Sequence, residues 1–315
     1  MSRRRPAPKG AALLVAMLVL TLVGTLAAGM IWQQTRTIGV ESAERQRAQA
    51  AWILTGALDL GRVLLRLDAR TPGVDHLNEL WATQLEEASL SSMLAQDRNN
   101  NVEGAPEAYL RGNIRDAQDR FNLRNLVDPA TRKIVNAEVE ALTRLCETAG
   151  VAPSVAQTLA SGLQAAWQAE EPGESEAGAL LAPQNLDQLV WLGLDAESVR
   201  RLRPYVELLP EATPLNINTA SAEVLAGVIA GLDLSSAKRL VNRRPYKALQ
   251  DARGDIQGSS ALDAKRLGVG SNYFVITGRL RMDGRVLEER LLVKRDNRQV
   301  VPLARWRQSL QPESD

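Results

Sequence analysis

The sequence contains little cysteine or histidine: one cysteine, Cys146, and one histidine, His76, occur in 315 residues. A single cysteine excludes an intramolecular disulfide and a cysteine-ligated zinc site, and a single histidine excludes a multi-histidine metal centre. A Ser-His-Asp or Cys-His catalytic apparatus is disfavoured for the same reason. These shortages predict a protein that is not an enzyme.

Aromatic residues and an excess of one charge are also scarce. Six Trp, four Tyr and two Phe offer few platforms for stacking the bases of a single strand. The 38 Lys and Arg against 37 Asp and Glu give a net charge of +1, far from the basic excess of a dedicated nucleic-acid binder. With 45 % hydrophobic and 24 % charged residues, the chain has the composition of a folded protein. We expect no nucleic-acid partner.

One long uncharged run follows the N-terminus. The chain opens with a basic segment that carries Arg3, Arg4, Arg5 and Lys9. No charge then appears between Gly10 and Thr35, a length that can span a bilayer. A cleaved signal peptide with a small-residue site near Leu26–Ala28 is the alternative, but this apolar run is longer than such peptides need and continues into a helical pattern. We therefore expect a retained transmembrane helix whose basic end stays in the cytoplasm.

The residues around Gly10 resemble a known leader. Lys9-Gly10 followed by the apolar stretch Ala11–Leu18 is similar to the leader of type IV pilins and type II secretion pseudopilins. The resemblance implies that prepilin peptidase cuts between Gly10 and Ala11 and that the new N-terminus at Ala11 is methylated. Most members have glutamate at the fifth mature position, where this chain has Val15. A carboxylate in lipid is costly unless it is paired. In lacking this glutamate, the chain resembles the minor pseudopilin K of type II secretion.

The segment after the membrane run has a helical period. Residues 33 to 68 contain no proline, and apolar positions recur every three or four residues. These positions are Ala50, Leu54, Ala57, Leu58, Gly61, Leu64 and Leu65. The pattern predicts one amphipathic helix that continues from the membrane and ends at Thr71-Pro72-Gly73. It resembles the pilin stem; the alternative is any membrane-anchored helix.

A second stretch is similar to the same family. Gly112–Val127 resembles the segment that pseudopilin K proteins carry between the stem and a large helical insertion. Short polar and apolar pieces around Asn113 predict a hairpin or paired strands. The Asp, Asn and Arg residues here are expected to cap turns and to do no chemistry.

The region from Asp128 to about Ala264 is predicted to be helical and contains an internal sequence repeat. Leu192–Asp195 and the residues after it return in similar form from Ala230–Asp233 onward, which predicts two related helix-turn-helix units. Asn218 or Thr219 is expected to cap the first helix of the second unit.

The second unit also resembles the helix-hairpin-helix modules of DNA-binding proteins of competence type. Such modules hold a phosphate on the backbone amides of a turn that needs glycine at its last position. Here the turns are Gly193-Leu194-Asp195 and Gly231-Leu232-Asp233, so a carboxylate would repel the phosphate. DNA binding therefore stays the less favoured alternative.

Candidate metal ligands are all oxygen atoms. The alternating series at 97–103 fails as an EF-hand, because Val102 stands where glycine and Ala108 where glutamate is needed. Resemblance to pseudopilin K implies calcium at an acidic stretch after a tryptophan, which here is Trp167. The candidate ligands are Glu170, Glu171, Glu174 and Glu176. A plain acidic loop is the alternative.

The last part of the chain switches to a period of two. Phe274, Ile276, Leu280 and Met282 alternate with polar residues, Asp283-Gly284 forms a turn, and Leu287, Leu291 and Val293 return. This pattern predicts a hairpin, which must pack on another surface to be stable. The amphipathic half of the stem helix is the available surface. Trp306 and the segment from Gln308 to Asp315 are expected to form a tail.

The predicted fold class is α+β: a long N-terminal transmembrane helix packed on a small antiparallel sheet, with a large all-α insertion of two helix-hairpin-helix or SAM-like units. Expected boundaries are a cleaved leader at 1–10, a transmembrane half-helix at 11–33, a stem with the first head strands at 34–122, helical units at 123–213 and 214–266, and a C-terminal hairpin and tail at 267–315.

The resemblance implies a minor pseudopilin at the tip of the type II secretion pseudopilus, which helps to initiate its assembly and the export of folded proteins across the outer membrane. Implied partners are the minor pseudopilins I and J, the major pseudopilin G, prepilin peptidase, the inner-membrane secretion platform and the bilayer. The implied location is the bacterial inner membrane, with a single pass, a cytoplasmic N-terminus and most of the chain in the periplasm. The alternatives are a membrane-tethered DNA-binding protein and a generic anchored scaffold.

Overall fold

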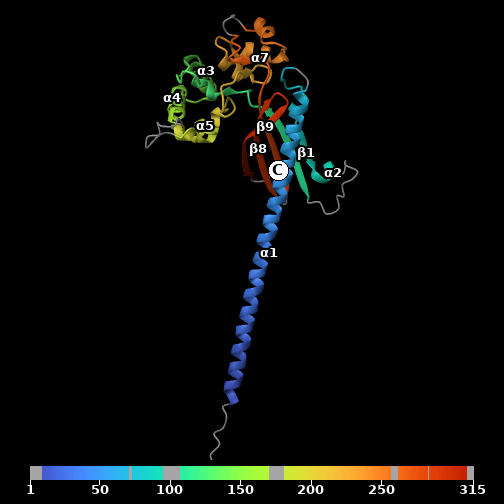
Figure 1. Cartoon of the computed structure of the whole chain (residues 1–315). Coiled ribbons are helices and arrows are strands. Elements are labelled where there is room, and N and C mark those ends of the chain that lie inside the picture. Colours follow the sequence, from blue (N-terminus) through green and yellow to red (C-terminus); the bar gives the residue numbers. More distant parts are fainter. Residues whose placement is uncertain are drawn as a thin grey trace, which may run out of the picture. The chain divides into compact units, whose positions relative to one another are not determined.

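A computed structural model describes residues 9–70, 73–94, 107–169, 181–256, 262–282 and 284–310 (Figure 1). The chain divides into two compact units, one ending at Thr55 and the other beginning at Gly56. The first unit is entirely helical where it is described. The second contains a β-sheet and a helical domain.

Helix α1 (Lys9–Asp68) contains the whole predicted stem. No proline interrupts it, and hydroxyl groups such as those of Thr21 and Thr25 bond back to carbonyls of the preceding turn, as these side chains do inside helices. The helix ends at Asp68, just before the predicted stop at Thr71–Gly73. Together with its high hydropathy, this confirms a helix that is long and apolar enough to cross a membrane.

The sheet of the second unit has five antiparallel strands in the order β1-β2-β7-β8-β9. Their bounds are β1 Leu85–Ser89, β2 Ala108–Asp116, β7 Tyr273–Met282, β8 Arg285–Asp296 and β9 Gln299–Leu310. Strand β2 pairs along its length with β7, from Ala108 opposite Met282 to Asp116 opposite Phe274. The chain between Asp116 and Tyr273 is therefore an insertion between two neighbouring strands of the sheet. A short helix, α2 (Leu90–Leu94), follows β1.

The C-terminal tail predicted from Trp306 onward is wrong for the residues up to Leu310, which belong to β9. The two-residue turn at Asn297–Arg298 reverses the chain after β8, and Asn297 has a φ of 52°. Asparagine tolerates this left-handed conformation, which such hairpin turns require. The predicted β7–β8 hairpin is confirmed, with Gly284 at a φ of 71° in its turn.

One face of the sheet packs on the last turns of α1. Leu58 and Leu65 are fully buried there with Phe274, Ile276 and other core residues. Gly61 lies so close to the sheet that a Cβ atom added to it would sit 2.6 Å from Cγ2 of Ile276. Glycine is thus needed for the close approach of helix and sheet. This packing confirms that the stem helix covers the predicted hairpin.

The segment between β2 and β7 forms the helical domain. Its helices are α3 (Asn136–Ala149), α4 (Ser154–Ala169), α5 (Ala196–Leu202), α6 (Ala222–Val228) and α7 (Leu234–Asn242). Short 3₁₀ turns within it occur at Leu123–Leu126, Leu186–Leu192 and Leu249–Gly254, and a further one at Leu80–Ala82 precedes β1. One continuous hydrophobic core runs from Phe121 to Leu267, so the two predicted helical units share their core.

Short strands at the edge of this domain pair in parallel. Strand β3 (Phe121–Asn122) pairs with β4 (Val206–Glu207), and β5 (Leu215–Asn216) pairs with β6 (Leu267–Gly268). Of the hairpin or paired strands predicted around Asn113, the paired strands are confirmed: Asn113 lies in β2, which pairs with β1 and β7, whereas β3 pairs with β4 of the helical domain. β2 pairs with β7, which is distant in the sequence, and not with the adjacent β3. A short polar segment contains no local signal for such a long-range pairing.

Candidate functional site

The candidate membrane anchor is the N-terminal part of α1. The most apolar 18-residue window of the segment Ala11–Asp68 has a mean hydropathy of 2.5. Val15 is exposed along with most large apolar residues between Leu13 and Trp32. Gly10 and Ala11 lie in the same helix. An unbroken helix that leaves its apolar side chains uncovered is suited to lipid, because all its backbone groups are bonded internally.

The two residues that most often carry catalysis are in unreactive places. Cys146 is fully buried in the helical core, and burial raises the pKa of its thiol to about 11, so the thiol stays protonated and poorly nucleophilic. His76 lies in a turn, where its Nδ1 accepts a hydrogen bond from the backbone N–H of Asn78 at 3.2 Å. Neither arrangement is that of a nucleophile or a general base.

The proposed calcium ligands Glu170, Glu171, Glu174 and Glu176 lie outside the described residues, as does the whole 97–103 series. Trp167, which precedes them, is buried in the helical core with the guanidinium of Arg124 3.9 Å from its ring centroid. Calcium at the glutamates stays a prediction from the sequence.

One group of carboxylates in the described part of the chain has a spacing that would suit a metal ion: Asp68, Asp75 and Glu79. The guanidinium of Arg295 already occupies this position. Its Nη1 donates to Asp68 at 2.6 Å, and its Nη2 donates to both carboxylate oxygens of Asp75 at 2.6 Å. Burial raises the pKa of Asp68 against the opposing effect of Arg295. The cluster is therefore a partly buried group of ion pairs that ties the end of α1 to the end of β8.

A second polar cluster joins the sheet to the helical domain, and we call it the junction cluster: Asp116, Asn216, Thr219 and Ser271. Oδ2 of Asp116 accepts from the hydroxyls of Ser271 and Thr219 at 2.6 Å each and from Nδ2 of Asn216 at 3.0 Å. All four residues are buried. Because β2 ends at Asp116 and β5 ends at Asn216, these bonds hold the start of the second helical unit against the sheet.

Burial dominates the electrostatics of Asp116. Loss of solvent and the nearby charge of Asp119 raise its pKa to about 6, although the hydroxyls of Ser271 and Thr219 oppose this by donating to the charged form. A carboxylic acid that titrates near this pH makes the stability of the junction depend on pH, with the protonated form favoured in the folded chain. The segment Gly112–Val127 was singled out by its family resemblance, and its polar residues were expected only to cap turns. That expectation missed the role of Asp116 as a buried hydrogen-bond acceptor in the junction cluster.

Two further side chains strengthen the junction. Gln118 donates from Nε2 to the carbonyl of Pro214 at 2.9 Å and accepts from the backbone N–H of Asn272 at 2.7 Å. Asn122 donates to the carbonyl of Glu211 and to the hydroxyl of Thr213. Amide side chains can donate and accept at once, which suits them to bridge segments far apart in the sequence.

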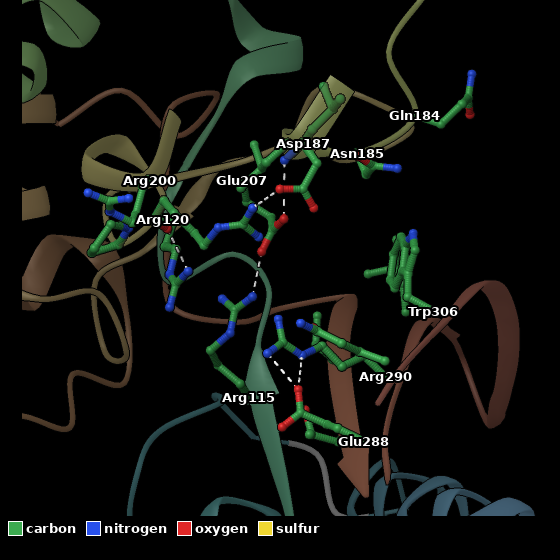
Figure 2. Close-up of a pocket in the computed structure, with 18 of the residues that line it drawn as sticks. Arg115, Arg120, Gln184, Asn185, Asp187, Arg200, Glu207, Glu288, Arg290 and Trp306 are labelled. Carbon is green, nitrogen blue, oxygen red and sulfur yellow. Dashed lines mark hydrogen bonds and ion pairs between the residues drawn. The ribbon is translucent and has the colours of Figure 1, made fainter. Parts of the chain in front are cut away.

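A groove of about 800 Å³ lies beside the junction, between the sheet and the segment 184–208 (Figure 2). Three ion pairs lie within its lining: Arg115 with Glu207, Arg203 with Asp187 and Arg290 with Glu288. Arg120 and Arg200 also line the groove, and they pair with Asp119 and Glu197 outside it. Trp306 and Gln308 of β9 line the groove from the sheet. Arginine and aromatic side chains are enriched in surfaces that contact other proteins.

The turns that resemble phosphate-binding hairpins use their amides internally. Asp195 and Asp233 are the N-caps of α5 and α7, and they accept from the backbone N–H groups of Ser198 and Ser236 at 2.8 and 2.9 Å. Bonds from serine side chains and backbone lower the pKa of both aspartates. The predicted cap at Asn218 or Thr219 is wrong, because Ser221 caps α6 and both of those residues are buried.

Comparison with known proteins gives a consistent result. Family models of type II secretion system protein K match residues 119–211 and 215–277. The chain is 30 % identical over 307 residues to type II secretion system protein K of Pseudomonas aeruginosa, covering 89 % of this chain and 87 % of that protein. It is 28 % identical to the protein K of Klebsiella pneumoniae, covering 75 % of each.

Among solved structures, the chain is similar to one in the crystal structure of the GspK–GspI–GspJ complex from the type 2 secretion system of enterotoxigenic Escherichia coli. The TM-score is 0.63 at 20 % identity, and the match covers 85 % of this chain and 98 % of that one. The fold is thus that of a pseudopilin: a long apolar helix, an antiparallel sheet and an inserted helical domain. The chain belongs to the type II secretion system protein K family, the minor pseudopilins of that system, which confirms the family predicted from the leader.

Proposed function

We propose that this minor pseudopilin stands at the tip of the type II secretion pseudopilus, where it helps to initiate assembly and so supports export of folded proteins across the outer membrane. The observation that carries the proposal is the helical domain inserted between the paired strands β2 and β7. A shaft subunit has another subunit above its head, and a domain of this size needs room that only the end of a filament offers.

The membrane segment supports the same place. Val15 stands where most pseudopilins have a glutamate, and the stretch from Gly10 to Thr35 carries no charge. A glutamate in lipid is tolerated when it pairs with the terminal amine of a neighbour. A first subunit, which is not added onto an earlier one, does not require that pair.

The proposal includes processing and location. Prepilin peptidase cuts between Gly10 and Ala11 and methylates Ala11. The helix then anchors the chain in the inner membrane by a single pass, with the basic end in the cytoplasm and the sheet and helical domain in the periplasm. Contacts with the inner-membrane platform and the major pseudopilin G follow from this position.

The proposed direct partners are minor pseudopilins I and J, which assemble with GspK in the Escherichia coli complex named above. The role is structural and not enzymatic, in keeping with the buried thiol of Cys146. The DNA-binding alternative is disfavoured by Asp195 and Asp233, whose carboxylates cover the helix N-termini that a phosphate would need.

The test is assembly of the full-length chain with the I and J proteins of the same secretion system, co-expressed and extracted in mild detergent. Native mass spectrometry should find one copy of each subunit in a single complex. A chain that stays alone and instead binds duplex DNA in a salt-sensitive way would favour the competence-type alternative. An Asp195→Gly, Asp233→Gly variant, which frees both turns, is the control for latent DNA binding.

A further inference from the structure

Strand β9 forms one edge of the sheet and is long for an edge strand. It spans Gln299–Leu310, whereas the opposite edge strand, β1, spans only Leu85–Ser89, contains a register shift and runs directly into α2. Exposed edges are sites where another strand can pair, and natural proteins usually shorten, cover or distort them. The outer side of β9 therefore needs an explanation.

The hydrogen-bond pattern shows which backbone groups face outward. The carbonyl of Val300 accepts from Nη2 and Nε of Arg62 at 3.1 and 3.4 Å, so it points away from β8. In an antiparallel pair such outward positions alternate. Following the register past the bulge between Leu292 and Val293, the outward residues of β9 are Val300, Pro302, Arg305, Arg307 and Ser309.

Protection of this edge is confined to its first half. Arg62 covers the carbonyl of Val300, Pro302 has no N–H to offer, and the bulge at Leu303 interrupts the ladder. From Ala304 to Leu310 the pairing with β8 is regular. Within the described residues, no hydrogen bond reaches the outward N–H and C=O groups of Arg305, Arg307 and Ser309.

The charge of the open half is one-sided. Arg305 and Arg307 both contact Glu289 of β8, whose carboxylate is fully buried, at 3.1 Å. Two guanidinium groups thus share one carboxylate and leave one positive charge at the edge. Both arginine side chains are about half exposed, at 44 % and 49 %, so an incoming acidic side chain can reach them.

On the other face of β9, Trp306 and Gln308 line the groove of Figure 2. A strand added beside β9 would alternate its side chains between the arginines and this face. The space beside Trp306 would receive an apolar side chain, and the position opposite Arg305 or Arg307 would receive a carboxylate.

We propose that Ala304–Leu310 is a docking edge, at which an extended strand of a neighbouring minor pseudopilin pairs with the outward groups of Arg305, Arg307 and Ser309 and places an acidic side chain beside the two arginines. The partner class rests on the proposed function. The site itself rests on the open ladder, the surplus positive charge and the groove beside Trp306.

The test compares two variants at one position in the full-length chain. Ser309→Pro removes one outward N–H and leaves the bonds to β8 in place, whereas Ser309→Ala removes only the hydroxyl. With the I and J proteins of the same system as probes, Ser309→Pro should bind about tenfold more weakly, and Ser309→Ala should bind like the wild type. Equal binding by a folded Ser309→Pro chain would overturn the docking edge while leaving the proposed function intact.

Residue-resolved hydrogen exchange of the unmodified chain gives an independent answer if the proline variant fails to fold. In the complex, the amides of Arg305, Arg307 and Ser309 should become protected, whereas those of Trp306 and Gln308, already bonded to β8, should change little. Exchange of the three outward amides at the same rate in free and bound chains would overturn the proposal. If the wild-type chain formed no complex with the I and J proteins, that result would contradict the proposed function and, with it, the proposed partner of the docking edge.

Discussion

The side-chain amide of Asn216 donates to Oδ2 of Asp116 at 3.0 Å and thereby joins the start of the second helical unit to the end of β2. The same oxygen accepts from Ser271 and Thr219. This one carboxylate therefore connects the sheet, the helical domain and the segment that returns to β7, and its protonation state affects all three.

The junction should make stability depend on pH. Burial raises the pKa of Asp116 from 3.8 to about 6, so the folded chain binds this proton more tightly than the unfolded chain. Stability from this group is present at low pH and is lost as pH rises through about 6, by about 3 kcal/mol in total. Asp116→Asn should flatten this part of the pH profile of thermal unfolding, although it lowers stability overall because its amide nitrogen faces the N–H of Gln118.

The exposed Asp296 gives the matched control for that measurement. Asp296→Asn should leave the slope between about pH 4 and about pH 7 as in the wild type. An unchanged slope in Asp116→Asn would show that Asp116 does not titrate as described.

Loss of Arg295 should strongly destabilise the head. Arg295→Gln leaves the buried carboxylate of Asp75 and the half-buried one of Asp68 without their cation, which costs about 3 kcal/mol or more. Chemical denaturation should show this loss, whereas Arg298→Gln, at an exposed turn position, should change stability by less than about 0.5 kcal/mol. Equal behaviour of the two variants would contradict the role of the buried pair.

Two glycines of α1 should respond in opposite directions to alanine. Gly61→Ala places a methyl group 2.6 Å from Cγ2 of Ile276 and should cost about 1–3 kcal/mol through overpacking. At Gly56 nothing lies within 4 Å of the added carbon, so Gly56→Ala should stabilise the helix by up to about 1 kcal/mol. Thermal unfolding of both variants measures the difference, and stabilisation by Gly61→Ala would contradict the tight contact.

Processing can be checked at the mature N-terminus. If prepilin peptidase cuts after Gly10, mass spectrometry of the membrane-extracted chain should find a methylated Ala11 as the first residue. Gly10→Glu should abolish the cut by placing a charged side chain where the leader has a small residue. A start near Ala28 would indicate an ordinary signal peptide.

The tip position predicts a weak response to a restored glutamate. Val15→Glu puts a carboxylate in lipid, where it is costly without a partner, so secretion of a folded substrate should stay equal or fall. Val15→Leu is the control that keeps the site apolar. Improved secretion by Val15→Glu alone would argue for a place within the shaft.

The local sequence pattern was enough to predict two elements: the long apolar helix and the β7–β8 hairpin. The uncharged run from Gly10 predicted a helix able to cross a membrane, because length and apolar composition decide this property. The alternation around Phe274 predicted the hairpin, because a half-buried strand repeats every two residues. The leader and Gly112–Val127 then identified the family by resemblance.

Tertiary structure decided what depends on residues far apart in the sequence. Trp306 and Gln308 look like part of a polar tail until β8 supplies a ladder for β9, and Asp116 looks like a turn residue until Asn216, Thr219 and Ser271 surround it. The sequence by itself therefore determined the long apolar helix, the helical period and the family, because these are local properties of the chain. The docking edge and the junction cluster exist only in the folded molecule, because strand pairing and burial bring together residues that share no local pattern.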